Sequence, residues 1–316
     1  MRFILIPIIF LGQVFATEVY IAPFKGDRKA AITYTFDDGL RSQYTKALPV
    51  LEGLGLKTTF FIVPGLTPNV TEEARRKRIA DWGSISWNEW VEVTAKGHEI
   101  GNHSLEHKNL AKESEFEINR QVNEAQQLIK EKLGITALTF CYPYNSRNEK
   151  VDSIVDKQFP FSRKYQTGFG GKMTTEIMNE VVDKAIMKGS WEVAMIHAIT
   201  LGYDQFKDPQ QLYDHWKYVK SIDSEVWVDT FSAIGQYKEL AKKVKLDVKE
   251  GENELSCFLK GMEESSYKSS LTLVVKVKAK TAKAMQAGSP LAVEVFKDKI
   301  LVDVDSNKGP VNITWN

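Results

Sequence analysis

Strand-like and helix-like patterns of apolar residues alternate along most of the chain. The β-rich run 30–36 ends abruptly at Asp37, and the stretch 42–54 that follows carries apolar residues at helical spacing. Residues 58–63 then form a second apolar run. A strand, a helix and a strand of these lengths are typical of a βαβ unit, in which the two strands are parallel.

The same alternation continues to about residue 245. Further helices are predicted at 87–96, 113–133 and 210–222, and further strands at 98–101, 138–142, 191–196 and 226–228. In the helix at 113–133 the expected inner positions are Phe116, Ile118, Val122, Ala125 and Ile129. Repeated alternation of this kind predicts an α/β fold, a complete or distorted (β/α) barrel.

The pattern changes to a period of two after residue 245. Four runs without a helix between them follow, at 271–278, 291–296, 300–304 and 311–315. Such runs predict a small antiparallel β-sandwich-like domain. We therefore expect a catalytic barrel over 17–245 and a C-terminal β domain over 246–316.

The first residues have the pattern of a signal peptide. Arg2 is followed by an apolar stretch at 3–11 and by the small-residue site Val14-Phe15-Ala16. The stretch is too short for a comfortable membrane span, and the alternative is a buried N-terminal strand. We expect cleavage after residue 16, a secreted or periplasmic protein and no membrane span in the mature chain.

Charge and cysteine content narrow the classes of partner. The chain has 42 basic and 41 acidic residues, a formal net charge of +1, and loss of residues 1–16 removes one arginine and no acid. A neutral chain does not favour nucleic acid or an anionic membrane as the main partner. Two cysteines exclude a disulfide framework, and Cys141 and Cys257 are expected to be buried free thiols. The sequence leaves the oligomeric state open.

Residues suited to hydrolytic chemistry follow several predicted strands. They are Asp37, Asp38, His103, His107, Tyr144 and His197. The carboxyl ends of parallel barrel strands share one face, and active sites lie on that face. His103 and His107 can point the same way on a helical turn and chelate one metal. Together with a carboxylate and an open fourth position, they describe a hydrolytic zinc site.

The motifs resemble a known family. Thr35-Phe36-Asp37-Asp38-Gly39, Gly97 to Asn102, His103-Ser104-Leu105-Glu106-His107 and Ile196-His197 are similar to motifs of the polysaccharide deacetylases, carbohydrate esterase family 4. The resemblance covers roughly residues 25–240. It implies a distorted (β/α) barrel that binds one divalent metal ion, usually Zn²⁺.

The resemblance also implies roles for single residues. It implies three metal ligands, which are Asp38, His103 and His107. Asp37 would be the general base for the attacking water, and His197 would protonate the leaving amine or alkoxide. The metal and the backbone N–H of Tyr144 would stabilise the tetrahedral oxyanion.

The chain departs from the family pattern in two places. The family's Pro-Tyr motif usually carries an arginine two residues before the proline, where this chain has Cys141. That arginine normally orients the base. The usual Asp-Trp element before the last histidine is also missing, and Asp183 and Trp191 are the nearest residues of the right types. The sequence thus leaves open what holds Asp37 and what tunes His197.

The predicted function is that of a secreted, metal-dependent carbohydrate deacetylase. Its substrate would be an acetylated oligo- or polysaccharide, either N-acetylated (chitin- or peptidoglycan-like) or O-acetylated (xylan-like). Two alternatives keep the same fold: a hydrolase of non-carbohydrate amides, and a catalytically silent glycan-binding protein. We assign packing to His98 and no role to His215, and we find no functional signal in Arg163 or Lys164.

Overall fold

The computed structural model describes residues 17–69, 83–261, 267 and 269–316. The predicted signal peptide 1–16 lies outside the described residues. The chain divides into two compact units. One unit is Pro23–Lys243 with Ser265–Ser269, and the other contains Val244–Glu264, Ser270–Asn316 and the chain up to Ala22.

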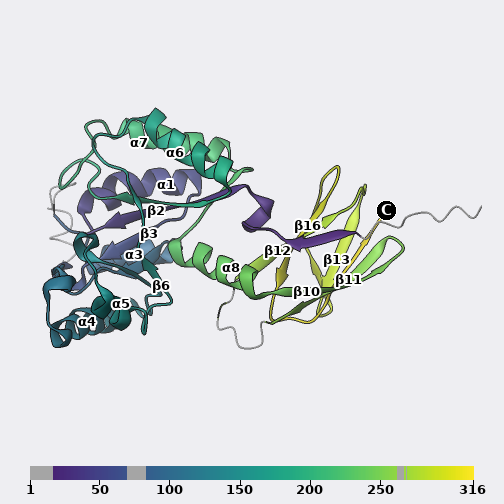
Figure 1. Ribbon diagram of the computed structural model, residues 1–316. Coiled ribbons are helices and arrows are strands. Elements are labelled where there is room, and N and C mark those ends of the chain that lie inside the picture. The colour runs from purple at the N-terminus through teal and green to yellow at the C-terminus, as the bar shows by residue number, and fades with distance from the viewer. Residues whose placement is uncertain (1–16, 70–82, 262–266, 268) are drawn as a thin grey trace, which may run out of the picture. The chain divides into compact units, whose positions relative to one another are not determined.

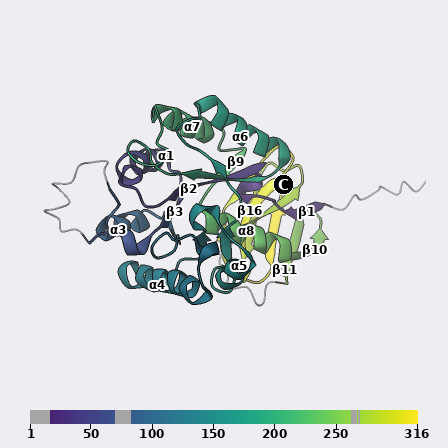
Figure 2. The ribbon, with the colours of Figure 1, turned by 60° about the vertical axis from the view of Figure 1, so that its left-hand side comes forward.

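The larger unit is a curled parallel sheet with helices around its outside (Figures 1 and 2). Its strands are β2 (Ala30–Asp37), β3 (Thr59–Ile62), β4 (Glu99–Asn102), β5 (Thr139–Cys141), β6 (Phe161–Arg163), β7 (Thr167–Gly168), β8 (Trp191–Ile196) and β9 (Val226–Val228). Its helices are α1 (Leu48–Leu54), α3 (Trp87–Ala95), α4 (Glu115–Leu133), α5 (Glu149–Val155), α6 (Thr175–Lys188), α7 (Gln210–Ser221) and α8 (Phe231–Lys243), and a π-helix (Gln43–Ala47) precedes α1. The predicted α/β class and distorted barrel are confirmed.

One short segment of the chain pairs with both ends of the sheet. The strand order is β6-β5-β4-β3-β2-β8-β7, with β9 paired to the first half of β2. The end strands β6 and β7 are separated by only residues 164–166. The stretch 161–168 therefore pairs with β5 through its first half and with β8 through its second half, which curls the sheet into a barrel.

Alternation along β2 gives the barrel a hydrophobic outside and a polar inside. Every residue of this strand is buried. Tyr34 and Phe36 point into the hydrophobic core beneath the helices, where the ring of Phe36 stacks on that of Phe60 with centroids 5.1 Å apart. Thr35 and Asp37 occupy the alternate positions and face the barrel interior, because successive strand residues point to opposite sides.

A half-buried carboxylate anchors α8 at the amino end of the sheet. Glu99, the first residue of β4, accepts hydrogen bonds from the hydroxyls of Thr59 at 2.7 Å and Thr139 at 2.9 Å. It also accepts the backbone N–H of Ser232, in the first turn of α8, at 3.0 Å. Burial raises the pKa of Glu99 despite these donors. The amino end of the barrel is thus occupied by α8.

The long helix α4 follows the predicted pattern except at one position. The Ser114 side chain accepts the backbone N–H of Glu117 at the amino end, and Gly134 ends the helix with φ 70°. Ile118 is buried, as predicted, whereas Phe116 is 80% exposed. The inward assignment of Phe116 was wrong, because two residues along a helix correspond to a rotation of about 200° away from Ile118.

The smaller unit consists of two antiparallel sheets, ordered β1-β12-β16-β15 and β10-β11-β17-β13-β14. The strands are β1 (Glu18–Ile21), β10 (Lys245–Gly251), β11 (Glu254–Lys260), β12 (Ser270–Lys276), β13 (Ala282–Gln286), β14 (Ser289–Leu291), β15 (Val293–Val295), β16 (Ile300–Asp305) and β17 (Val311–Trp315). The antiparallel character of this region is confirmed.

The boundary predicted at residue 17 differs from the structure. Residues 18–21, expected in the barrel, form β1 and pair with β12 in the register Glu18↔Lys276. Backbone pairing to a strand far along the chain determines this position, and four residues are too few to reveal it in a pattern.

Cys141 and Cys257 are free and buried, as expected. Among the described helices, none combines the length and apolar character needed to cross a bilayer.

His215 of α7 is a neutral histidine in the hydrophobic core. Its Nδ1 lies 2.7 Å from Asn179 Oδ1, which can only accept, so Nδ1 carries the proton. Its Nε2 lies 2.7 Å from the Tyr34 hydroxyl, which donates to it. Burial lowers the pKa of His215 to about 3. The imidazole therefore joins α6, α7 and β2 as an uncharged hydrogen-bonding group.

We expect His215 to make the fold acid-sensitive. Its pKa is about 3 in the folded chain and near 6.5 when exposed, so the unfolded chain binds the extra proton between these values. As pH falls below 6.5, the wild-type free energy of unfolding should drop by up to about 1.4 kcal/mol per pH unit more than that of His215→Gln. Denaturant unfolding between pH values of about 7 and about 4 measures this. Equal slopes for the two proteins would contradict it.

Candidate active site

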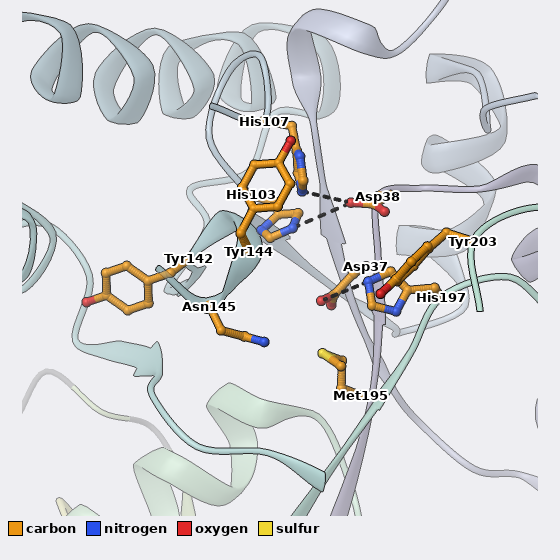
Figure 3. A pocket seen from close by; sticks show the side chains of 10 residues that line it. All are labelled: Asp37, Asp38, His103, His107, Tyr142, Tyr144, Asn145, Met195, His197 and Tyr203. Atoms are coloured by element: carbon orange, nitrogen blue, oxygen red, sulfur yellow. Dashed lines mark ion pairs between the residues drawn. The ribbon is translucent and has the colours of Figure 1, made fainter. Parts of the chain in front are cut away.

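A cavity of about 510 Å³ opens at the carboxyl ends of the barrel strands (Figure 3). Its lining residues are Asp37, Asp38, His103, His107, Tyr142, Tyr144, Asn145, Met195, His197 and Tyr203. All six site residues predicted from the sequence are among them. The barrel topology therefore collects these residues from distant parts of the sequence around one cavity.

The turn after β2 points the side chains of the two adjacent aspartates in different directions. Asp37 is the last residue of β2, and its side chain continues the inward alternation of the strand. Asp38 and Gly39 both adopt left-handed backbone angles, with φ of 72° and 64°. Aspartate tolerates this region better than most residues, and the turn directs Asp38 toward the two histidines. The adjacent carboxylates thus have different neighbours.

The two histidines converge through a loop and not through the predicted helical turn. Ser104 and His107 have positive φ values of 63° and 57°. The Asn102 side chain accepts the Ser104 N–H at 2.8 Å, and the Ser104 hydroxyl accepts the His107 N–H at 3.1 Å. These bonds fold the loop so that the rings of His103 and His107 lie 4.8 Å apart.

The donor set of Asp38, His103 and His107 fits a tetrahedral divalent ion. Asp38 Oδ1 lies 3.5 Å from Nε2 of His103 and 3.3 Å from Nε2 of His107. Tetrahedral bonds of about 2.0–2.1 Å place neighbouring ligand atoms about 3.3–3.4 Å apart. Asp38 Oδ1 is buried and accepts no hydrogen bond from the described residues. The three groups form one of the two clusters of potential metal ligands in the described part of the chain.

The tautomer of His103 suits this role. Its Nδ1 lies 2.8 Å from the backbone carbonyl oxygen of Cys141, which can only accept a hydrogen bond. Nδ1 therefore carries a proton, and Nε2, which faces Asp38, is the nitrogen that could bind a metal. A backbone acceptor behind a metal-binding histidine orients the ring in this way in many sites.

Arg163 at the end of β6 holds Asp37. Its Nη1 donates to Asp37 Oδ1 at 2.8 Å, and its Nη2 donates to Oδ2 at 2.5 Å. Nη1 also lies 2.6 Å from the Thr35 hydroxyl. Both members of the ion pair are buried, with side-chain exposures of 0% and 3%. Arg163 therefore belongs to the site, although no sequence pattern indicated a functional role for it.

The arginine that holds Asp37 lies on β6, one strand away from the position on β5 where the family motif is expected to carry an arginine. Cys141 of β5 and Arg163 of β6 are direct partners in the parallel register, so their side chains lie on the same face. Cys141 Sγ lies 3.9 Å from Asp37 Oδ2. The small thiol leaves room for the guanidinium to arrive from the neighbouring strand. Strand β6 was not predicted, and without it nothing linked Arg163 to the site.

The ion pair determines the charge of Asp37. Burial alone raises the pKa of this carboxyl, but the charge and hydrogen bonds of Arg163, with His103 and His197, outweigh burial and hold the pKa below its ordinary value. Asp37 is therefore ionised at neutral pH. The same pairing raises the pKa of Arg163.

His197 follows β8 and faces Asp37 across the cavity. Its Nε2 lies 4.0 Å from Asp37 Oδ2, whereas its buried Nδ1 has no hydrogen-bond partner among the described residues. Asp183 accepts the Tyr218 hydroxyl on α7, and Trp191 lies at the opposite end of β8, where it donates to Thr33. Neither residue replaces the missing Asp-Trp element.

Two exposed tyrosines flank the cavity. Tyr144 has a left-handed backbone, with φ 58°, and its ring lies 4.6 Å from that of His107. Tyr203, which the sequence pattern did not single out, lies 4.9 Å from the ring of His197. Their relative exposures are 66% and 73%. In Figure 3 the two rings lie on either side of the aspartates.

The fold and the site define an α/β-barrel protein with a cluster of potential metal ligands in a cavity at the carboxyl ends of its strands. Residues 25–158 match the family model described as polysaccharide deacetylase. The match confirms the resemblance seen in the motifs, and this part of the chain is similar to the polysaccharide deacetylases.

Curated relatives match about 40% of the chain. A peptidoglycan-N-acetylglucosamine deacetylase of Bacillus cereus is 32% identical over 132 residues, which cover 40% of this chain and 41% of that protein. The deacetylase PgdA of Listeria monocytogenes is 28% identical over 135 residues, covering 40% of this chain and 24% of that protein. The chain thus spans less than half of these relatives. The Xyl-CE4 domain of a xylanase from the hindgut metagenome of Trinervitermes trinervoides aligns with a TM-score of 0.49 and 20% identity, over 67% of this chain and 92% of that domain.

Removal of Arg163 should destabilise the barrel. Arg163→Met leaves the buried Asp37 carboxylate without its cation, and we expect the free energy of unfolding to fall by about 3–5 kcal/mol. Lys164→Met is the matched control, because Lys164 pairs with Asp156 at a partly exposed position and should change stability by less than about 1 kcal/mol. Denaturant unfolding measures both.

A relocated arginine provides the complementary test. Cys141→Arg combined with Arg163→Ser supplies a guanidinium from β5 in place of β6. We expect this double variant to recover part of the stability that Arg163→Met loses. An Arg163→Met protein as stable as the wild type would contradict the assigned role of the ion pair.

Proposed function

We propose that the protein is a metal-dependent carbohydrate deacetylase that hydrolyses acetyl groups from saccharides. One observation carries the proposal: a carboxylate and two imidazoles at metal-ligand spacing share a cavity with an arginine-held carboxylate and a third imidazole. Attack of water on an acetyl carbonyl requires a base, an electrophile and an acid, and these groups can supply all three.

Asp38, His103 and His107 are the proposed holders of a divalent ion, with Zn²⁺ expected. A bound divalent ion supplies Lewis-acid chemistry, which polarises a carbonyl and lowers the pKa of water. The protein prepares these ligands in advance: the backbone of Cys141 selects the His103 tautomer, and the 103–107 loop sets the spacing. The cation then needs little rearrangement of the protein to bind.

The remaining groups divide the proton transfers between them. Asp37, ionised because of Arg163, is the proposed base that accepts a proton from the attacking water. The new carbon–oxygen bond places negative charge on the acetyl oxygen, and the Tyr144 backbone N–H is the proposed donor to it. His197 is the proposed acid that gives a proton to the leaving nitrogen or oxygen as that bond breaks. The products are acetate and a free amine or hydroxyl.

The tyrosines and the curated relatives support a saccharide as substrate. Tyr144 and Tyr203 expose flat apolar rings beside the histidines, and such rings pack well against the apolar faces of sugars. The Bacillus cereus and Listeria relatives are named as peptidoglycan-N-acetylglucosamine deacetylases, which favours an N-acetylated sugar. An O-acetylated glycan uses the same chemistry and is the second substrate class to test.

We further propose that residues 1–16 direct the export of a secreted enzyme and that the antiparallel unit has a structural and not a catalytic role. A protein that acts on polysaccharides outside the cell meets its substrate only after export. The near-balance of charge suits a neutral glycan better than a polyanion.

Acetate release tests the proposed activity. The protein should release acetate from N-acetylglucosamine oligomers or from O-acetylated xylo-oligosaccharides. A chelator should abolish the release, and added Zn²⁺ should restore it. Failure to release acetate from any member of the panel with the metal present would contradict the proposal and favour a silent glycan-binding protein.

Metal titration tests the proposed ligands. His107→Ala should weaken Zn²⁺ binding on the order of 100-fold or more, because even loss of a residue behind a ligand costs about 10–100-fold. His98→Ala is the control: His98 is buried and hydrogen-bonded to Glu52 at 2.9 Å, and its loss should leave Zn²⁺ affinity unchanged. Isothermal titration of the metal-free proteins measures both, and equal affinities would refute the ligand assignment.

A further inference from the structure

Gln43 joins the ends of the two strands that carry the proposed base and acid. It is the first residue of the π-helix and is completely buried. Its Nε2 donates to the backbone carbonyl of Asp37 at 2.6 Å and to that of His197 at 3.0 Å. One side-chain amide group thus uses both of its N–H bonds, one on each strand.

This bridge begins where the sheet ladder stops. Strands β2 and β8 are paired in parallel register from Ala31↔Trp191 to Phe36↔Ile196. Asp37 and His197 are the next residues along each strand and have no Cα pairing with each other. At the position of Asp37 and His197, the Gln43 amide therefore provides the link between the two chains that strand pairing no longer provides.

Neighbouring contacts hold the bridge in place. The hydroxyl of Ser42 accepts the backbone N–H of Ile199 at 3.0 Å, which ties the loop after His197 to the same turn. The π-helix, an arrangement often found at functional sites, begins at Gln43 itself. Ser42 and Gln43 together therefore fasten the end of β8 to the chain that follows β2.

His197 depends on this backbone attachment more than a paired histidine would. Its Nδ1 has no hydrogen-bond partner among the described residues, and its Nε2 is 4.0 Å from Asp37 Oδ2. A partner at Nδ1 is the usual means of fixing an imidazole. Here the placement of the ring relative to Asp37 comes from the backbone, which Gln43 ties on both sides.

We propose that Gln43 is a positioning residue that sets the separation between Asp37 and His197. The proposal rests on the proposed function for its catalytic consequence, whereas the bridge itself is a structural property. Among the described residues, the hydrogen bonds of the Gln43 side chain go to backbone carbonyls and not to the side chains of the proposed metal ligands, and Gln43 does not line the cavity. Its loss should therefore affect proton transfer and leave metal binding intact.

The proposed test compares two buried glutamines whose side-chain amides both donate to backbone carbonyls. Gln43→Met keeps the side-chain length and removes both donors. Gln286→Met is the matched control, because Gln286 of β13 is also buried and donates to the carbonyls of Asp305 at 2.8 Å and Lys308 at 2.9 Å. Both variants should lose stability, but only Gln43 lies beside the proposed site.

The expected kinetic result is a fall in kcat of about 10–100-fold for Gln43→Met, with KM and Zn²⁺ stoichiometry unchanged, because small displacements of reacting groups cost about that much. Gln286→Met should keep the wild-type kcat. Gln43→Asn, whose amide is one carbon shorter and cannot span both carbonyls, should show the same loss if Gln43→Met fails to fold. A kcat within about twofold of wild type would overturn the proposal.

Amide hydrogen exchange provides a readout that needs no activity. Exchange in segments 36–40 and 196–200 should be faster in Gln43→Met than in wild type, and unchanged in Gln286→Met. Exchange in these segments that is the same in Gln43→Met as in wild type would contradict the proposal that Gln43 joins the strand ends. If the wild type releases no acetate, the proposed function fails by itself, and exchange still decides whether Gln43 joins the strand ends.

Discussion

The buried ion pair between Asp37 and Arg163 is the interaction on which the organisation of the barrel interior depends. A carboxylate with 3% exposure is costly unless a cation and hydrogen bonds compensate for lost water. Arg163 provides both through its bidentate contact. The pair links β2 to β6, and β6 is the first half of the segment that curls the sheet.

The same interaction explains why Cys141 is compatible with the family site. Cys141 and Arg163 are register partners, so the guanidinium that holds Asp37 comes from the strand next to the one that carries Cys141. What the buried carboxylate of Asp37 requires is a bidentate cation of fixed orientation, and the position of that cation in the sequence matters less. The backbone of Cys141 meanwhile orients His103, a role that no side chain at position 141 needs to fill.

Much of the fold could be predicted because its signals are local. The strand at 191–196, the strand at 226–228 and helix α4 are marked by apolar runs, periodicity and capping residues. Strand β6 was missed because three residues with one arginine carry no pattern. The helical turn proposed for His103 and His107 was wrong because spacing of four residues is shared by helices and by tight loops with left-handed residues.

The sequence by itself determined the alternation of strands and helices, and with it the set of side chains that follow strand ends. Asp37, Asp38 and His197 could be assigned to one face because parallel strands finish on the same side. Only the tertiary structure decided which groups support them, namely Arg163 and Gln43. Their contacts join strands and turns that are more than 120 residues apart for Arg163–Asp37 and more than 150 apart for Gln43–His197. Such contacts follow from the register of the folded sheet, and no local pattern encodes them.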